Sequence, residues 1–139
     1  MSIRSRYESE LALVFNKLVE MCHTVELAIE KSVVSLKMRN ADLAHEVMSE
    51  DRNVDNMERE IEQDCLKILL MERPVAGDFR DVSAALKMIT DLERIADQAA
   101  DISEITLQFG QEAFIKEPEH IAMMARLVTG MVKDGVQSY

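Results

Sequence analysis

Glycine, proline and tryptophan are scarce in this chain. Its 139 residues include 4 Gly, 2 Pro and no Trp. All-β sandwiches and barrels need many tight turns, and tight turns depend on glycine and proline, so this composition argues against those folds. No stretch approaches the ~18 apolar residues of a transmembrane helix. The N-terminal segment lacks the apolar region and cleavage site of a signal peptide, so we expect a cytoplasmic protein.

Cysteine and basic residues are also in short supply. Cys22 and Cys65 stand alone on apolar stretches without CxxC spacing, which predicts two reduced thiols in the core. Lys and Arg number 16 against 26 Asp and Glu, giving a formal net charge of −10. Such a surface disfavours nucleic acid and anionic membranes as partners and suits cations or basic partners. We therefore expect neither nucleic-acid binding nor direct membrane insertion.

Apolar residues recur at alternating spacings of three and four along most of the chain, which is typical of amphipathic helices. The pattern predicts a first helix over Ile3–Arg39, a second over about Ala41–Met71 and a third over about Asp78–Phe109. Asn40 is suited to close the first helix or to cap the second. The Pro/Gly cluster at residues 72–78 separates the second helix from the third. The expected fold class is all-α, an antiparallel up-down three-helix bundle.

The last part of the chain predicts a further helix. Residues 1–112 form the expected bundle, and residues 113–139 form a linker followed by a helix that begins near Pro118. Its apolar stripe (Ile121, Met124, Val128 and Met131) stops near Tyr139 without a cap, which indicates a truncated chain. Because a closed three-helix bundle has no vacant groove for this helix, we expect it to mediate a homodimer or a swapped oligomer.

Signatures of catalysis are absent from the sequence. It contains no GxSxG, no glycine-rich phosphate loop, no HExxH and no Walker motif, so we expect no catalytic residues and no enzymatic activity. Glu20 and His23 have the Glu-x-x-His spacing that supplies metal ligands in di-iron bundles. His23 and His45 would nevertheless lie ~18 Å apart along the bundle axis and could not share a metal pair.

Two pairs of acids offer a better candidate site. Asp51 and Asp55 are four residues apart on the second predicted helix, and Glu93 and Asp97 are four apart on the third. This spacing places each pair on one helical face. Both pairs would stand ~27 Å above the Pro/Gly turn, level with each other. They either converge on a site for a hard cation or form a solvated acidic face, and the choice depends on the handedness of the bundle.

Three segments of the sequence together resemble the PhoU family. They are residues 50–55 (EDRNVD), residues 65–80 (CLKILLMERPVAGDFR) and residues 84–104 (AALKMITDLERIADQAADISE). Members typically hold two tandem three-helix repeats, and this chain would hold one repeat plus the start of the second. The resemblance implies a cytoplasmic negative regulator of high-affinity phosphate uptake and phosphate-starvation signalling. It implies an adaptor to the phosphate-transporter ATPase and to a phosphate-sensing histidine kinase.

The resemblance also implies a metal-binding role for the two acidic pairs. The family motif, an acid followed four residues later by Asp, binds metal clusters and falls on the two acidic pairs identified above. The resemblance therefore implies bound divalent or ferric ions (Fe, Mn, Mg, Zn or Ca). The chain departs from the family at Ala96 and Gln98, where Gly and His are common. A carboxylate-bridged metalloenzyme or a metal-storage bundle is the alternative that uses the same acids.

Overall fold

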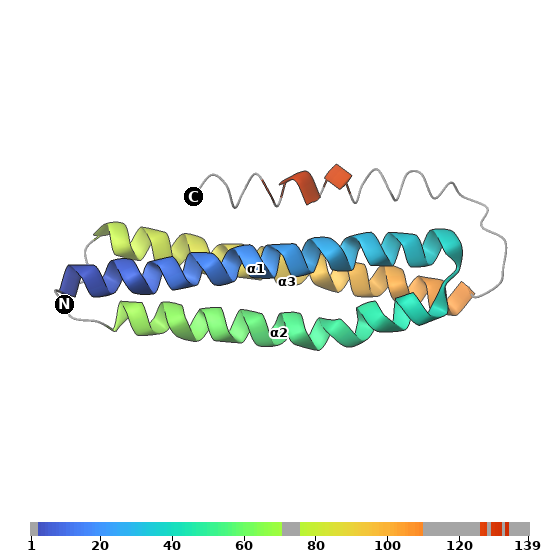
Figure 1. Ribbon diagram of the computed structural model, residues 1–139, viewed down its shortest axis with the longest axis horizontal. Helices are drawn as coiled ribbons and strands as arrows, with labels where there is room; N and C mark the ends of the chain where they lie inside the picture. The colour runs from blue at the N-terminus through green and yellow to red at the C-terminus, as the bar shows by residue number, and fades with distance from the viewer. Residues whose placement is uncertain (1–2, 71–75, 110–125, 128, 132, 134–139) are drawn as a thin grey trace.

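Three long helices, each running antiparallel to the one before it, form an elongated bundle (Figure 1). They are α1 (Ile3–Met38), α2 (Ala41–Leu69) and α3 (Ala76–Phe109). The computed structural model describes residues 3–70, 76–109, 126–127, 129–131 and 133, and these residues include no strand. No helix among them is long and apolar enough to cross a membrane. The expected all-α, up-down three-helix architecture is confirmed.

The turn between α1 and α2 depends on two adjacent residues. Arg39 has a φ of 53°, in the left-handed region, so α1 ends at Met38, one residue earlier than the sequence predicts. The backbone N–H of Asn40 donates to the carbonyl of Ser35, which closes α1. The Asn40 side chain accepts from the backbone N–H of Leu43, 3.1 Å away, and caps α2. Asn40 therefore both closes α1 and caps α2, the two roles that the sequence left as alternatives.

The boundaries around the second turn also differ slightly from the prediction. Helix α2 ends at Leu69 with Leu70 as its C-cap, and Met71 lies outside the described residues. Helix α3 begins at Ala76, two residues earlier than predicted. Asp78 therefore lies inside the first helical turn, where its carboxylate is buried against α1. The burial of Asp78 ties the start of α3 to the start of α1.

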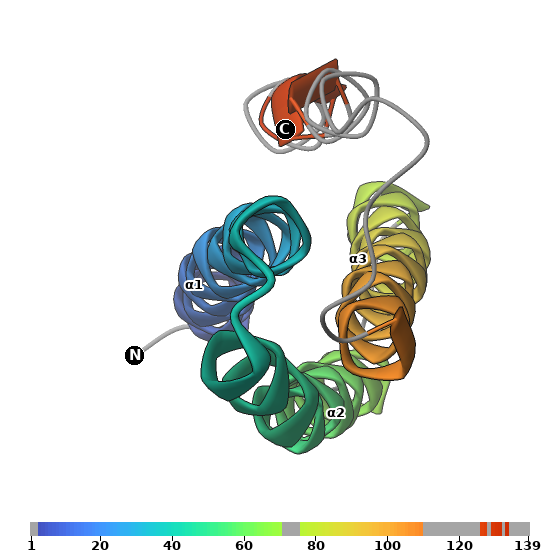
Figure 2. The ribbon, with the colours of Figure 1, turned by 90° about the vertical axis from the view of Figure 1, so that its right-hand side faces the viewer.

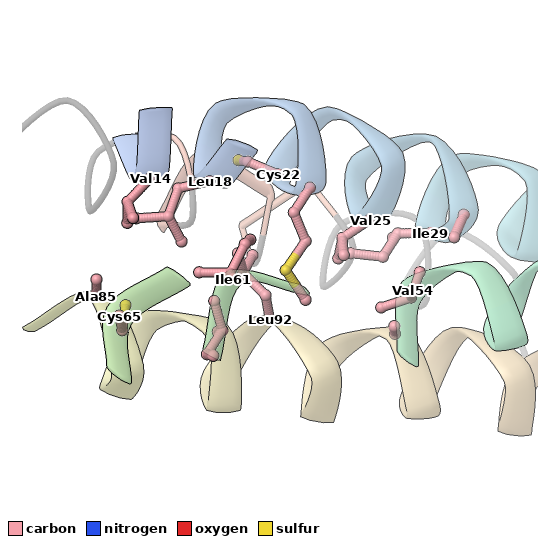
Figure 3. Packing of buried hydrophobic residues seen from close by; sticks show 14 of the residues in the cluster. Val14, Leu18, Cys22, Val25, Ile29, Val54, Ile61, Cys65, Ala85 and Leu92 are labelled. Atoms are coloured by element: carbon pink, nitrogen blue, oxygen red, sulfur yellow. The ribbon is translucent and has the colours of Figure 1, made fainter. Parts of the chain in front are cut away.

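The core runs the length of the bundle between the three helices (Figure 3). Each helix contributes an apolar stripe with the spacing seen in the sequence, so all three pairs of helices pack together. Cys22 on α1 and Cys65 on α2 are both buried and free, as predicted. Residues labelled in the close-up are Val14, Leu18, Cys22, Val25, Ile29, Val54, Ile61, Cys65, Ala85 and Leu92.

Ion pairs line the seam between α1 and α2. Lys17 contacts both Glu60 and Asp64, and Lys31 contacts both Glu46 and Glu50. The two lysines therefore balance the acids on the side of α2 that faces α1. The acids on the opposite side of α2, toward α3, are not reached by these lysines.

The described part of the last segment, residues 126–133 with gaps, is helical and lies alongside α1 (Figure 2). Lys133 Nζ lies 3.5 Å from Glu26 Oε2 on α1. The expectation that this segment has no place on its own bundle is therefore wrong for these residues. Met131 is 72% exposed and Leu127 63% exposed, so neither of these two apolar side chains packs closely against α1. Three residues of its predicted apolar stripe, Ile121, Met124 and Val128, lie outside the described residues.

Candidate metal centre

Six carboxylates line the seam between α2 and α3, and we call this set the acidic ridge. The three acids on α2 follow one another at spacings of four and three, and those on α3 at spacings of four, so each set lies on one helical face. Buried apolar neighbours such as Val54 and Leu92 fix the rotation of each helix and hold that face at the seam. The members of the acidic ridge are Asp51, Asp55, Glu58, Glu93, Asp97 and Asp101.

The structure brings the two predicted pairs of acids together across the seam. One carboxylate oxygen from each of Asp55, Glu58 and Glu93 lies within 4.8 Å of the others. The carboxylate of Asp51 is close enough to Asp97 for their repulsion to raise the Asp51 pKa. The handedness of the bundle therefore makes the pairs converge, which the sequence could not decide.

Burial and repulsion from neighbouring carboxylates raise the pKa values of three ridge acids, Asp51, Glu58 and Glu93. Burial, followed by repulsion from Asp97, Glu58 and Asp55, raises the pKa of Glu93 to about 6. The pKa values of Asp51 and Glu58 are raised by burial and then by neighbouring carboxylates. All three pKa values are raised, because burial and neighbouring negative charges both disfavour the ionised carboxylate.

Positive charge from the protein is missing where the ridge would need it. Within the described residues, no Lys or Arg forms an ion pair with any of the six carboxylates. Arg59 only partly offsets the upward shift in the pKa of Glu58. Arg94, which directly follows Glu93, is exposed and forms no ion pair in this part of the chain. The ridge is therefore an uncompensated acidic cluster.

The donor set fits a hard cation. Asp51 Oδ1 is buried and has no hydrogen-bond partner among the described residues, so it retains free lone pairs inside the seam. Carboxylate oxygens are the ligands preferred by Mg²⁺, Ca²⁺ and Mn²⁺ and also bind iron. A cation bound at the ridge would reduce the repulsion between neighbouring carboxylates, and one bound beside Asp51 would also satisfy its orphaned oxygen. The ridge acids are the residues that would hold such cations, and Asp55, Glu58 and Glu93 already bring one oxygen each within 4.8 Å of the others.

Two ridge members, Glu58 and Asp101, were not anticipated from the sequence. Their spacing could have indicated them, since Glu58 follows Asp55 by three residues and Asp101 follows Asp97 by four, which places each on the same helical face as its neighbour. His23 and His45 are exposed and belong to no ligand group at the ridge, and His120 lies outside the described residues. Of the two departures from the family pattern, Ala96 faces the core and Gln98 is exposed, so neither replaces a ridge carboxylate.

Comparison with known proteins gives a consistent picture. A family model described as the PhoU domain matches residues 18–106. A protein of Aquifex aeolicus named phosphate-specific transport system accessory protein PhoU homolog is 33% identical over 130 residues, covering 94% of this chain and 59% of that protein. A protein of the same name from Deinococcus radiodurans is 33% identical over 129 residues, covering 93% of this chain and 61% of that protein.

Solved structures agree with the sequence matches. The crystal structure of PhoU from Pseudomonas aeruginosa superposes with a TM-score of 0.85 at 29% identity, covering 91% of this chain and 61% of that one. The phosphate transport system regulatory protein PhoU from Streptococcus pneumoniae shares the fold, with a TM-score of 0.84 at 22% identity, covering 96% of this chain and 62% of that one. The chain spans about three fifths of the length of these relatives, whose names are those of accessory or regulatory proteins rather than enzymes. The chain belongs to the PhoU family.

Proposed function

We propose that this chain acts in the cytoplasm as a metal-binding regulator of phosphate transport. The observation that carries the proposal is the acidic ridge, where acids from two helices gather and form no ion pair with a Lys or Arg among the described residues. Relatives named as accessory proteins of a phosphate-specific transport system support the phosphate part of the proposal. In this reading the metal has a structural and regulatory role, since it cancels the repulsion between α2 and α3 and sets the charge of that face.

The proposed partners are the phosphate-transporter ATPase and a phosphate-sensing histidine kinase, whose signalling the chain would restrain. A net charge of −10 suits partner surfaces rich in Lys and Arg. A metal ion at the ridge would reduce the negative charge shown to such a surface, so metal loading and partner binding would be coupled. We also propose a homodimer or swapped oligomer, supported by the exposed apolar side chains of Leu127 and Met131.

The decisive experiment measures metal in protein purified without chelator. We expect elemental analysis to find a bound hard cation in the unaltered chain and little in the double variant Asp55→Asn/Asp97→Asn. These substitutions remove two charges from the ridge with little change of shape. The matched control is Asp42→Asn/Asp91→Asn, which removes one exposed carboxylate from each of the same two helices. Full metal content in the ridge variant, with helicity unchanged, would refute the metal site.

A carboxylate-bridged metalloenzyme or a metal-storage bundle would use the same oxygen ligands. Several ridge acids, including Asp55 and Glu93, are only partly buried, so a bound ion would be within reach of solvent. A regulator should show no hydrolase or oxidase turnover in the metal-loaded state. Metal-dependent turnover that disappears in Asp97→Asn would favour the enzyme, and loading with many ions per chain would favour storage.

A further inference from the structure

A cavity of about 460 Å³ lies between the second half of α1 and the helical segment at residues 126–133. Its floor is apolar and consists of Ile29, Val33 and Val34 on α1. Ile29 and Val33 are buried, whereas Val34 is 45% exposed and forms an accessible apolar wall. The volume falls within the range of about 300–1,000 Å³ that is usual for small-molecule sites.

The polar lining of this cavity is mostly positive. Lys37, Arg126 and Lys133 contribute three cations, against one acid, Glu30. This local excess is opposite to the −10 charge of the whole chain. Lys133 shares its charge with the buried Glu26, but Lys37 and Arg126 form no ion pair among the described residues. Two cations at the rim are therefore available to an anion from solution.

We propose that this pocket binds a small organic anion with an apolar body, such as a medium-chain carboxylate or alkyl phosphate. The alkyl body would lie on the floor formed by Ile29, Val33 and Val34, where its burial is favourable. The head group would accept hydrogen bonds from Lys37 and Arg126, one from each wall. Inorganic phosphate has the charged head group but no alkyl chain, so contact with the apolar floor would not stabilise its binding.

Such a ligand would contact two separate parts of the chain. Lys37 belongs to α1, whereas Arg126 belongs to the last segment, so an anion between them would hold that segment against α1. Among the described residues, the segment also contacts α1 through the Lys133–Glu26 ion pair, while the side chains of Leu127 and Met131 are largely exposed. Occupancy of the pocket would therefore slow proteolysis within residues 126–133.

The test titrates the full chain with decanoate, decyl phosphate, decanol and inorganic phosphate by calorimetry. We expect saturable binding of one molecule per chain for decanoate, decyl phosphate or both, with the better ligand identifying the preferred head group. Decanol, which has the body without the charge, should bind at least about tenfold more weakly, because it lacks charge-assisted hydrogen bonds. Inorganic phosphate should not bind.

Variants locate the site. Lys37→Glu/Arg126→Glu should weaken binding of the better anion by about tenfold or more, and Val34→Trp should also weaken it by occupying part of the apolar floor. Lys87→Glu, which reverses an exposed cation on α3, is the matched control and should bind normally. The proposal fails if neither decyl anion binds, if decanol binds as tightly as decanoate, or if the pocket variants bind like the control with helicity preserved. Metal content at the ridge is independent of all these outcomes.

Discussion

The buried carboxylate of Asp78, in the first turn of α3, accepts two hydrogen bonds from the Arg4 guanidinium, at 2.6 Å and 2.9 Å. The same guanidinium lies 5.4 Å from the centre of the Tyr7 ring. Arg4→Met should destabilise the bundle because it removes two charge-assisted hydrogen bonds from a buried carboxylate. Urea unfolding should show a clear loss of stability, whereas Arg6→Met, which removes an exposed cation two residues along α1, should be nearly neutral. Equal midpoints for the two variants would show that the Arg4 contact contributes nothing.

Glu58 and Asp101 should both affect metal binding, although the sequence did not nominate them. Each contributes a carboxylate to the ridge, so Glu58→Gln and Asp101→Asn should each weaken metal affinity by about tenfold or more. Titration of metal-free protein would measure this, with Asp91→Asn as the control on the solvent side of α3. Unchanged affinity in both variants would restrict the site to the four acids nominated from the sequence.

The stability of the metal-free chain should fall as pH rises from about 4.5 to above 6. The pKa of Glu93 is raised to about 6 by burial and by repulsion from Asp97, Glu58 and Asp55. The folded state therefore holds a proton that the unfolded state releases earlier, so stability is greatest when Glu93 is protonated. Glu93→Gln should stabilise the metal-free chain at pH 7 by about 1 kcal/mol and flatten the pH profile. A profile as steep as that of the unaltered chain would contradict this assignment.

The two thiols should be unreactive while the chain is folded. Burial raises the pKa of Cys22 to about 11, aided by Glu26, and burial raises that of Cys65 to about 11. Thiolate is the reactive form, and it is scarce at pH 8. A thiol reagent such as dithiobisnitrobenzoate should therefore label neither cysteine in buffer and both in urea. Rapid labelling of one cysteine in buffer would reveal local opening around that residue.

Self-association should depend on the outward side of the last segment. Leu127 and Met131 are largely exposed, and burying such a side chain contributes roughly 1.5–3 kcal/mol. Leu127→Glu/Met131→Glu should therefore raise the dimer dissociation constant by well over tenfold in sedimentation experiments. Leu70→Glu, at the far end of α2, should leave it unchanged. A monomer at tens of micromolar for the unaltered chain would remove the basis for a dimer.

The fold could be predicted from the sequence because its signals are local. Apolar spacing alone places Val54 and Ile61 on one stripe and Ile89 and Leu92 on another, and both stripes are buried. The turn at Asn40 was equally readable, since a capping side chain acts within three residues. Boundaries were less certain because Arg39 adopts a left-handed conformation that its residue type does not favour.

From the sequence, the acids of the candidate site could be grouped only within each helix, not between helices. Spacing places Asp51 with Asp55 and Glu93 with Asp97, but whether the pairs meet depends on how the helices are wound around each other. The same limit applies to Asp78, whose buried contact with Arg4 joins residues 74 positions apart. The contact between Lys133 and Glu26 could not be predicted from local spacing either, because it joins two residues that are far apart in the sequence.

Two lysines of α1, Lys17 and Lys31, affect how quickly a cation would reach the ridge. Lys17 and Lys31 hold the acids on one side of α2, so the unbalanced negative field extends into solvent from the α2–α3 side. At physiological ionic strength this field reaches about 8 Å, so it attracts cations before they touch a carboxylate. If the ridge binds a cation as proposed, we expect its association to be electrostatically steered, with a rate constant that falls steeply as salt is added.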